Sequence, residues 1–134
     1  MSIHSNFSVP GTEFRSVPRA QITHMTYKEC LAYLDSLGSD MMKRKLGLEK
    51  ITILLDALGN PQRSFLSVSV AGTNGKGSTS VLLAGILSLS GIRTGLFTSP
   101  HLVRLNERIK INGTDIPDEK FANVFSEVLE VTKK

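Results

Sequence analysis

Apolar residues recur at helical spacing in three stretches of the chain. At the start of the first stretch, Thr26 and Glu29 form a capping-box pattern, and Gly38 is expected to end the helix. The second stretch covers residues 48–58, and the third begins near Pro117, where acidic residues suit the positive end of the helix dipole. Each stretch has one apolar face, so each predicts an amphipathic helix that packs against other elements.

The middle of the chain follows a different pattern. Residues 65–71 alternate between apolar and small side chains, which predicts a strand, and residues 81–89 are apolar nearly all round, which is typical of a helix buried against a sheet. A second strand is predicted over residues 93–98, so these elements should form a βαβ unit with parallel strands. A short strand near residues 108–111 precedes an Asn-Gly turn signal at 112–113. The predicted fold class is therefore α/β.

A glycine-rich loop joins the predicted strand to the apolar helix, and it reads Gly-Thr-Asn-Gly-Lys-Gly-Ser-Thr. Backbone N–H groups of such a loop can point at phosphate oxygens, and the helix N-terminus adds partial positive charge. Lys76 can reach the β- and γ-phosphates, and the hydroxyl of Ser78 or Thr79 is expected near a magnesium ion. The alternative is a plain turn between two elements. The loop predicts that ATP and Mg²⁺ bind at the following residues, with Lys76 as the catalytic one: Gly72, Thr73, Asn74, Gly75, Lys76, Gly77, Ser78 and Thr79.

This loop is shorter than the general G-x-x-x-x-G-K-[ST] pattern, and Gly77 stands where a hydroxyl residue normally follows the lysine. It resembles the ATP loop of the Mur ligase superfamily, and the glycine after the lysine resembles the branch of folylpolyglutamate and dihydrofolate synthases. Three further segments resemble that branch in order and spacing, namely residues 58–62, 95–102 and 106–113. The resemblance runs from about Tyr27 to the end of the chain.

The resemblance implies a P-loop NTPase-like fold of the Mur ligase central-domain type, with a parallel sheet flanked by helices that is incomplete in this chain. It also implies ATP-dependent amide ligation. The γ-phosphoryl group passes to a carboxylate of a folate or of dihydropteroate, and the amine of L-glutamate attacks the acyl phosphate. Members of the family are several times longer, and their remaining magnesium ligands lie in the part that this chain lacks. We therefore expect an N-terminal fragment that is inactive alone.

A second candidate segment follows the predicted strand over residues 93–98. Ligands of open α/β sheets bind beyond the carboxyl ends of the strands, so Ser99 is expected near the phosphate loop. The resemblance makes Ser99 a magnesium ligand, and Ser78 is the second candidate for that role. It places His101, Arg104 and Arg108 near the folate substrate, where a guanidinium can pair with a carboxylate. A Ser-Pro turn, a surface histidine and a solvated strand edge remain the alternatives for these residues.

Composition fits a globular domain, since the 134 residues are 40% hydrophobic and 21% charged. Residues 64–113 contain five basic residues and one acidic residue, so the phosphate loop lies in a positive stretch that suits ATP or a carboxylate. No basic helix face or aromatic cluster indicates nucleic-acid binding, and the most apolar run, residues 81–92, is too short to span a membrane. Cys30, the single cysteine, is expected in the core and suits the reducing cytoplasm.

The expected organisation is a flexible extension over residues 1–24, followed by the truncated N-terminal part of an ATP-binding domain over residues 25–134. The extension is rich in Ser, Pro, Thr and Arg and lacks a periodic apolar pattern. Two other functions stay open. One is a non-catalytic module that binds nucleotide, and the other is a different P-loop phosphotransferase, which Gly77 disfavours. The sequence leaves the oligomeric state open.

Overall fold

A computed structural model describes residues 23–37 and 47–133 of the chain. Most of the predicted extension over residues 1–24 lies outside this part, as does Gly38. The described residues form helices α1 (Tyr27–Ser36), α2 (Leu48–Ala57), α3 (Lys76–Leu89) and α4 (Asp118–Thr132). They also form the 3₁₀ turns η3 (Pro61–Arg63) and η4 (Leu105–Arg108) and the strands β1 (Gly95–Phe97), β2 (Ile109–Ile111) and β3 (Thr114–Asp115).

The predicted capping box at the start of α1 is confirmed. The Glu29 backbone N–H donates to the Thr26 hydroxyl, and the Thr26 backbone N–H donates to the Glu29 carboxylate at 2.7 Å. These two bonds satisfy backbone donors that the first turn of a helix leaves without an intrahelical partner. The chain therefore enters α1 in a fixed direction, with Tyr27 as the first helical residue.

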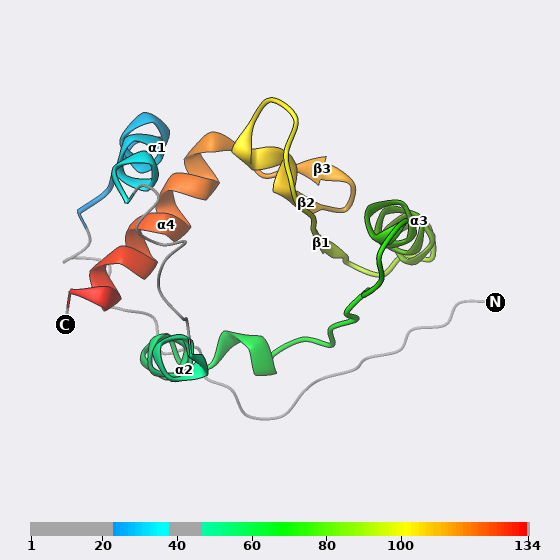
Figure 1. The fold of residues 1–134 in the computed structure, drawn as a ribbon, viewed down its shortest axis with the longest axis horizontal. Helices are drawn as coiled ribbons and strands as arrows, with labels where there is room; N and C mark the ends of the chain where they lie inside the picture. The colour runs from blue at the N-terminus through cyan, green and yellow to red at the C-terminus, as the bar shows by residue number, and fades with distance from the viewer. Residues whose placement is uncertain (1–22, 38–46, 134) are drawn as a thin grey trace.

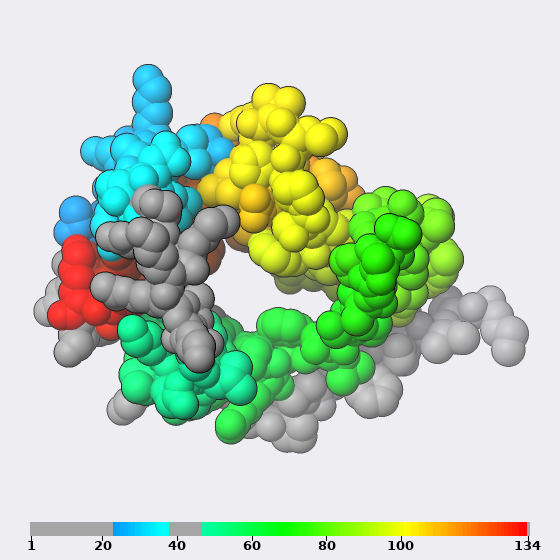
Figure 2. Space-filling model, in the orientation of Figure 1, coloured from blue at the N-terminus to red at the C-terminus, as the bar shows by residue number. Residues whose placement is uncertain are grey.

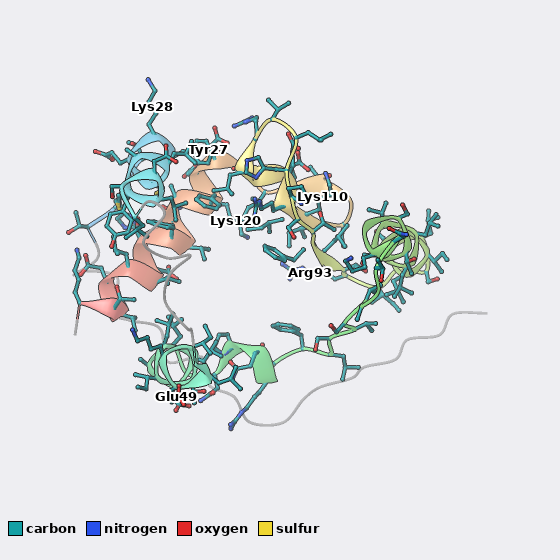
Figure 3. All side chains as sticks on the ribbon, in the orientation of Figure 1. Tyr27, Lys28, Glu49, Arg93, Lys110 and Lys120 are labelled. Atoms are coloured by element: carbon teal, nitrogen blue, oxygen red, sulfur yellow. The ribbon has the colours of Figure 1, made fainter. Side chains whose placement is uncertain are left out.

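The best-buried part of the described structure lies between α1 and α4. Aromatic rings join the two helices, because Tyr27 meets Phe121 edge-on at 5.6 Å between centroids and Tyr33 meets Phe125 at 5.9 Å. The predicted core position of Cys30 is confirmed, since this residue of α1 is fully buried. Figure 3 shows Tyr27 near the start of α4, whereas Lys28 points away from the molecule.

The sheet is small and antiparallel, in the order β1-β2-β3. Leu96 of β1 lies opposite Lys110 of β2, and the predicted Asn-Gly turn joins β2 to β3. Asn112 and Gly113 both have positive φ, at 49° and 80°, which is the conformation that a tight two-residue hairpin requires. The Asn112 side chain also accepts a hydrogen bond from the Thr94 backbone N–H at 2.8 Å, which ties the turn to the start of β1.

The predicted parallel pairing of residues 65–71 with the next strand is wrong for the described structure. Residues 66–72 have no assigned secondary structure, and β1 pairs with β2 instead. A strand forms only where a neighbour accepts and donates its backbone hydrogen bonds, and alternation of side chains does not supply that neighbour. Leu66 is consequently fully exposed. The burial expected for α3 is wrong for the same reason, because β1 covers one side of this helix and Leu82 and Leu89 remain exposed.

Figure 1 shows how these elements are arranged around an open centre. Helices α1 and α4 lie together on one side, α3 lies on the opposite side, and the strands connect the two. The space-filling view in Figure 2 shows that side chains leave the centre open in this orientation. None of the described helices is long and apolar enough to cross a membrane.

Candidate functional site

The glycine-rich loop leads directly into α3, which begins at Lys76. Gly75 occupies the N-cap position with a φ of 76°, a conformation that favours glycine because it has no Cβ. The Thr79 backbone N–H donates to the Gly75 carbonyl at 2.9 Å and closes the first helical turn. The N–H groups of residues 76–78 precede this bond and have no intrahelical partner, and no side chain caps this helix. The start of α3 therefore offers free donors to an anion.

Lys76 is the first residue of α3, and its side chain folds back over the loop. Its Nζ donates to the Gly72 carbonyl at 2.6 Å and to the Thr73 carbonyl at 3.1 Å. No acidic residue lies in the first turn of α3, so the ammonium group has no carboxylate beside it there. A phosphate that enters the loop can replace these two carbonyls as the acceptor for Lys76.

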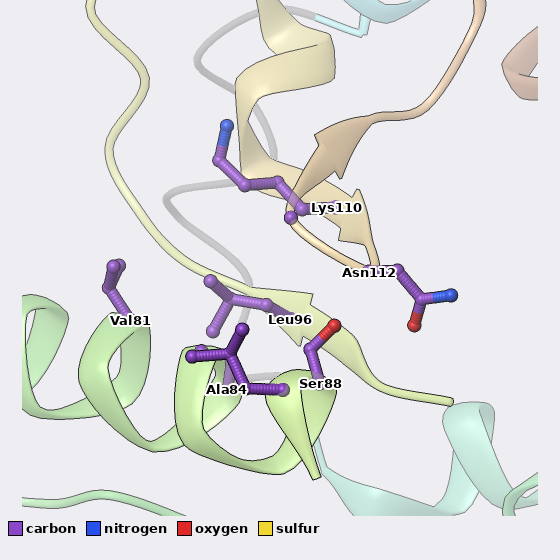
Figure 4. A pocket seen from close by; sticks show the side chains of 9 residues that line it. Val81, Ala84, Ser88, Leu96, Lys110 and Asn112 are labelled. Carbon is purple, nitrogen blue, oxygen red and sulfur yellow. The ribbon is translucent and has the colours of Figure 1, made fainter. Parts of the chain in front are cut away.

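Ser99 follows β1, and the connection from α3 to β1 spans only residues 90–94. Because α3 and β1 pack together across this short connection, β1 runs back along the helix. Figure 4 shows Leu96 of β1 facing Val81 and Ala84 of α3. The carboxyl end of β1 therefore points toward the end of α3 that carries the loop, and the expected proximity of Ser99 to this loop stays a prediction. The assignment of Ser99 as a metal ligand stays a prediction.

A groove of about 350 Å³ lies between α3 and the hairpin of β2 and β3 (Figure 4). The residues that line it are mainly apolar or small: Val81, Ala84, Gly85, Ser88, Leu89, Leu96, Lys110, Asn112 and Gly113. None of them belongs to the glycine-rich loop. The groove is thus separate from the predicted phosphate site.

One carboxylate within the segment after Ser99 binds the segment's own backbone. Glu107 accepts hydrogen bonds from the backbone N–H groups of Leu102, Val103 and Arg104, at 2.8, 3.1 and 2.8 Å. These bonds favour the ionised form and lower the pKa of Glu107 from its ordinary value. The largest effect comes from the Leu102 N–H and the next from the Arg104 N–H, while burial acts in the opposite direction. Leu102 and Val103 themselves remain exposed at the tip.

We expect the contribution of Glu107 to stability to depend on pH. Its pKa is lowered in the folded state, so its bonds stabilise the fold above the ordinary value of 4.5, and this stabilisation is lost as the pH falls through the folded-state pKa. Glu107→Gln should therefore melt at a lower temperature than the wild type at neutral pH, and the difference should shrink in acid. Thermal melting followed at a series of pH values measures this. A difference that stays constant with pH would contradict the role of the charge.

The structure brings two of the three predicted substrate residues together. Arg108 Nε donates to His101 Nδ1 at 2.7 Å, which fixes the imidazole with its proton on Nε2. Arg104 is engaged elsewhere, because its guanidinium donates to Asp118 at 2.6 Å and lies 5.7 Å from the centre of the Tyr27 ring. The substrate roles of these residues stay predictions.

Sequence reasoning missed the two residues, Asn106 and Asp118, whose hydrogen bond ties this segment to the start of α4. Asn106 is 3% exposed, and its side-chain amide donates to the Ile116 carbonyl at 2.7 Å and to Asp118 at 2.8 Å. Asp118 was expected only as part of an acidic first turn. The one indication for Asn106 was its place inside a segment that resembles a family motif, and this resemblance assigned no function to the residue.

No family model matches this chain. Among curated proteins, it is 46% identical over 83 residues to a dihydrofolate synthetase of Saccharomyces cerevisiae, a match that covers 62% of this chain and 19% of the relative. It is 42% identical over 99 residues to a folylpolyglutamate synthase of Lacticaseibacillus casei, covering 74% of this chain and 23% of the relative. The matched residues are related to the folylpolyglutamate and dihydrofolate synthases.

Solved structures of these synthases have the same fold over the matched part. A folylpolyglutamate synthetase from Lactobacillus casei aligns with a TM-score of 0.74 at 39% identity, covering 81% of this chain and 27% of the other. A bifunctional folylpolyglutamate synthase/dihydrofolate synthase from Yersinia pestis aligns with a TM-score of 0.73 at 31% identity, covering 88% and 28%. One further match, with a TM-score of 0.72, is a synthase complex with AMPPCP and folate. The predicted α/β class of the Mur ligase type is confirmed, and the chain spans about a fifth of the length of these curated relatives.

Proposed function

We propose that this chain supplies the phosphate-binding end of an ATP-dependent ligase that joins L-glutamate to a folate or to dihydropteroate. In this reaction the γ-phosphoryl group of ATP moves to the acceptor carboxylate to form an acyl phosphate. The glutamate amine then attacks the acyl carbon, which forms the amide and releases inorganic phosphate. The observation that carries the proposal is the start of α3, where free backbone N–H groups and the Lys76 ammonium converge on one exposed loop. Phosphoryl transfer depends mainly on positioning and charge neutralisation, and these groups supply both.

The nucleotide assignment is supported by a synthase of the same fold that has been solved with AMPPCP and folate. AMPPCP is an analogue of ATP, and its phosphate chain is the part of the molecule that a glycine-rich loop binds. We assign residues 72–79 to this role, with Lys76 at the β- and γ-phosphates. Residues 25–134 are then the first part of the ATP-binding domain.

Magnesium is the second component of the proposed site. It prefers oxygen ligands and keeps several waters, so the hydroxyls of Ser78 and Ser99 suit it. The described residues contain no group of three or more acidic, histidine or cysteine side chains that could hold a metal. Magnesium supplies charge neutralisation on the phosphates when it is bound there. We assign His101 and Arg108 to binding of the acceptor substrate. The proposed location is the cytoplasm, because the single cysteine, Cys30, is a buried free thiol.

The proposal predicts that the 134-residue chain binds ATP with magnesium but makes no product alone. The described residues hold one end of the site, and the matched region is only about a quarter of the solved synthases. Binding is followed by the fluorescence of N-methylanthraniloyl-ATP with and without Mg²⁺. Ligation is followed with ATP, Mg²⁺, dihydropteroate or folate, and radiolabelled glutamate. Glutamylated product above the level of a Lys76→Ala control would show that this chain holds more of the active site than we propose.

The magnesium assignment is tested in the same binding assay. Ser99→Ala should reduce the gain in nucleotide affinity that Mg²⁺ gives, and the affinity without the metal should not change. Ser90→Ala is the matched control, because Ser90 is exposed at the far end of α3. An unchanged magnesium effect in Ser99→Ala would refute the ligand role, and failure of the wild type to bind ATP would refute the proposed function itself.

A further inference from the structure

The segment from Ser99 to Arg108 carries the proposed magnesium and acceptor residues, and it has little secondary structure of its own. Its tip is exposed, since Leu102 and Val103 have 93% and 83% of their surface accessible. Hydrogen bonds to side chains therefore have to hold it in place. Glu107 supplies such bonds from within the segment. The bonds that tie the segment to the rest of the molecule come from elsewhere.

Two of those outside bonds converge on one carboxylate oxygen. Asp118 Oδ1 accepts from the Arg104 guanidinium at 2.6 Å and from the Asn106 amide at 2.8 Å. Arg104 and Asn106 flank Leu105 at the start of η4, so Asp118 binds the segment at two residues that are separated by one position. Asn106 is buried and also binds the Ile116 carbonyl, which fixes the direction of its amide group. Asp118 is the first residue of α4, so these two hydrogen bonds connect the segment to the helix that packs against α1 through aromatic rings.

We propose that Asp118 is a positioning residue, which holds the segment of residues 99–108 against the α1–α4 core so that Ser99, His101 and Arg108 face the bound nucleotide and acceptor. The inference rests on the proposed function and reassigns one of its residues. Arg104 acts as an anchor for the segment, because its guanidinium is already shared between Asp118 and the Tyr27 ring. Arg108 has its Nε on His101 and keeps its terminal nitrogens for a carboxylate.

A second carboxylate on the same helical turn provides a matched control. Glu119 follows Asp118 in the first turn of α4, so both interact favourably with the helix dipole. In contrast to Asp118, Glu119 has no hydrogen bond to the segment among the described contacts. Asp118→Ala and Glu119→Ala thus both remove a negative charge from the first turn of α4. Only Asp118→Ala also removes the hydrogen bonds to Arg104 and Asn106.

The experiment compares these two variants of the 134-residue chain with the wild type. Amide hydrogen exchange is measured at Leu102, Val103 and Arg104, and N-methylanthraniloyl-ATP binding is measured with and without Mg²⁺. We expect Asp118→Ala to speed exchange at these amides by about tenfold or more and to remove most of the affinity gained from Mg²⁺. Affinity without the metal should be unchanged, because that binding belongs to the glycine-rich loop. Glu119→Ala should resemble the wild type in both assays.

A purely structural role would give a different result. If Asp118→Ala lowers the melting temperature but leaves loop exchange and the magnesium effect unchanged, Asp118 only supports the start of α4 and the proposal is overturned. Should this variant fail to fold, Asp118→Asn keeps the acceptor oxygen but removes the charge, and it should show the same two effects in weaker form. Failure of the wild-type chain to bind ATP would overturn the proposed function, whereas unchanged exchange would overturn the positioning role.

Discussion

We expect Lys76→Ala to weaken binding of ATP by this chain on the order of 10- to 100-fold, the effect of losing one charge-assisted hydrogen bond. In an active ligase, the same change should lower turnover on the order of 100-fold, because the ammonium neutralises charge that develops on the phosphates. The structure supports this role because the Lys76 side chain already lies over the loop that receives the phosphates. Titration with N-methylanthraniloyl-ATP measures the effect on binding.

Lys120→Ala is the control for the loss of positive charge. Lys120 is an exposed residue of α4 on another element, so its replacement changes net charge equally without touching the loop. Thermal melting should show little change for either variant, since Lys76 is exposed and binds only carbonyls of its own loop. Equal affinities for ATP in Lys76→Ala and Lys120→Ala would refute the assignment of the glycine-rich loop.

The second large effect is expected from Phe121→Ala, which should lower the free energy of unfolding by about 2–3 kcal/mol. Phe121 lies at the centre of the aromatic cluster, where it meets Tyr27 edge-on and stacks on Phe125 at 6.0 Å between centroids. Its loss leaves a space between α1 and α4, where the described residues are best buried. Urea unfolding followed by circular dichroism gives the change in free energy.

Val124→Ala is the corresponding control on the same helix. Val124 is 48% exposed, so its truncation should change the free energy of unfolding by less than about 1 kcal/mol. Both substitutions place alanine in a helix and leave its polar contacts intact. If the two variants unfold at the same urea concentration, the aromatic cluster does not form the core of this part of the chain.

The helices could be predicted from the sequence because their signals are local. The capping box at Thr26 and Glu29 and the apolar faces of α1, α2 and α4 each depend on residues three or four positions apart. The hairpin turn at Asn112 and Gly113 is equally local, since its backbone needs positive φ at two adjacent positions. The start of α3 was expected a few residues later, because its first turn contains glycine and serine and lacks an apolar pattern.

Contacts between distant residues were less predictable. Alternation over residues 65–71 predicts a strand but does not name its neighbour, and the described sheet pairs β1 with β2. Arg104 illustrates the same limit at the candidate site. The sequence shows a guanidinium that needs a carboxylate, and the structure shows that Asp118, 14 positions further on, supplies one. The glycine-rich loop can be recognised in the sequence because its residues are contiguous, and its role in binding phosphate stays a prediction.

No side chain caps the start of α3, so the nucleotide that we propose to bind there would also affect the stability of this helix. A phosphate group that accepts hydrogen bonds from the free backbone N–H groups there would take the place of a capping side chain. The proposed nucleotide binding and the stability of the helix would then be thermodynamically linked. At a nucleotide concentration about 100 times its dissociation constant, this linkage adds about 2.7 kcal/mol to the folded state. If ATP binds at the proposed loop, the melting temperature of this chain should therefore rise with ATP concentration.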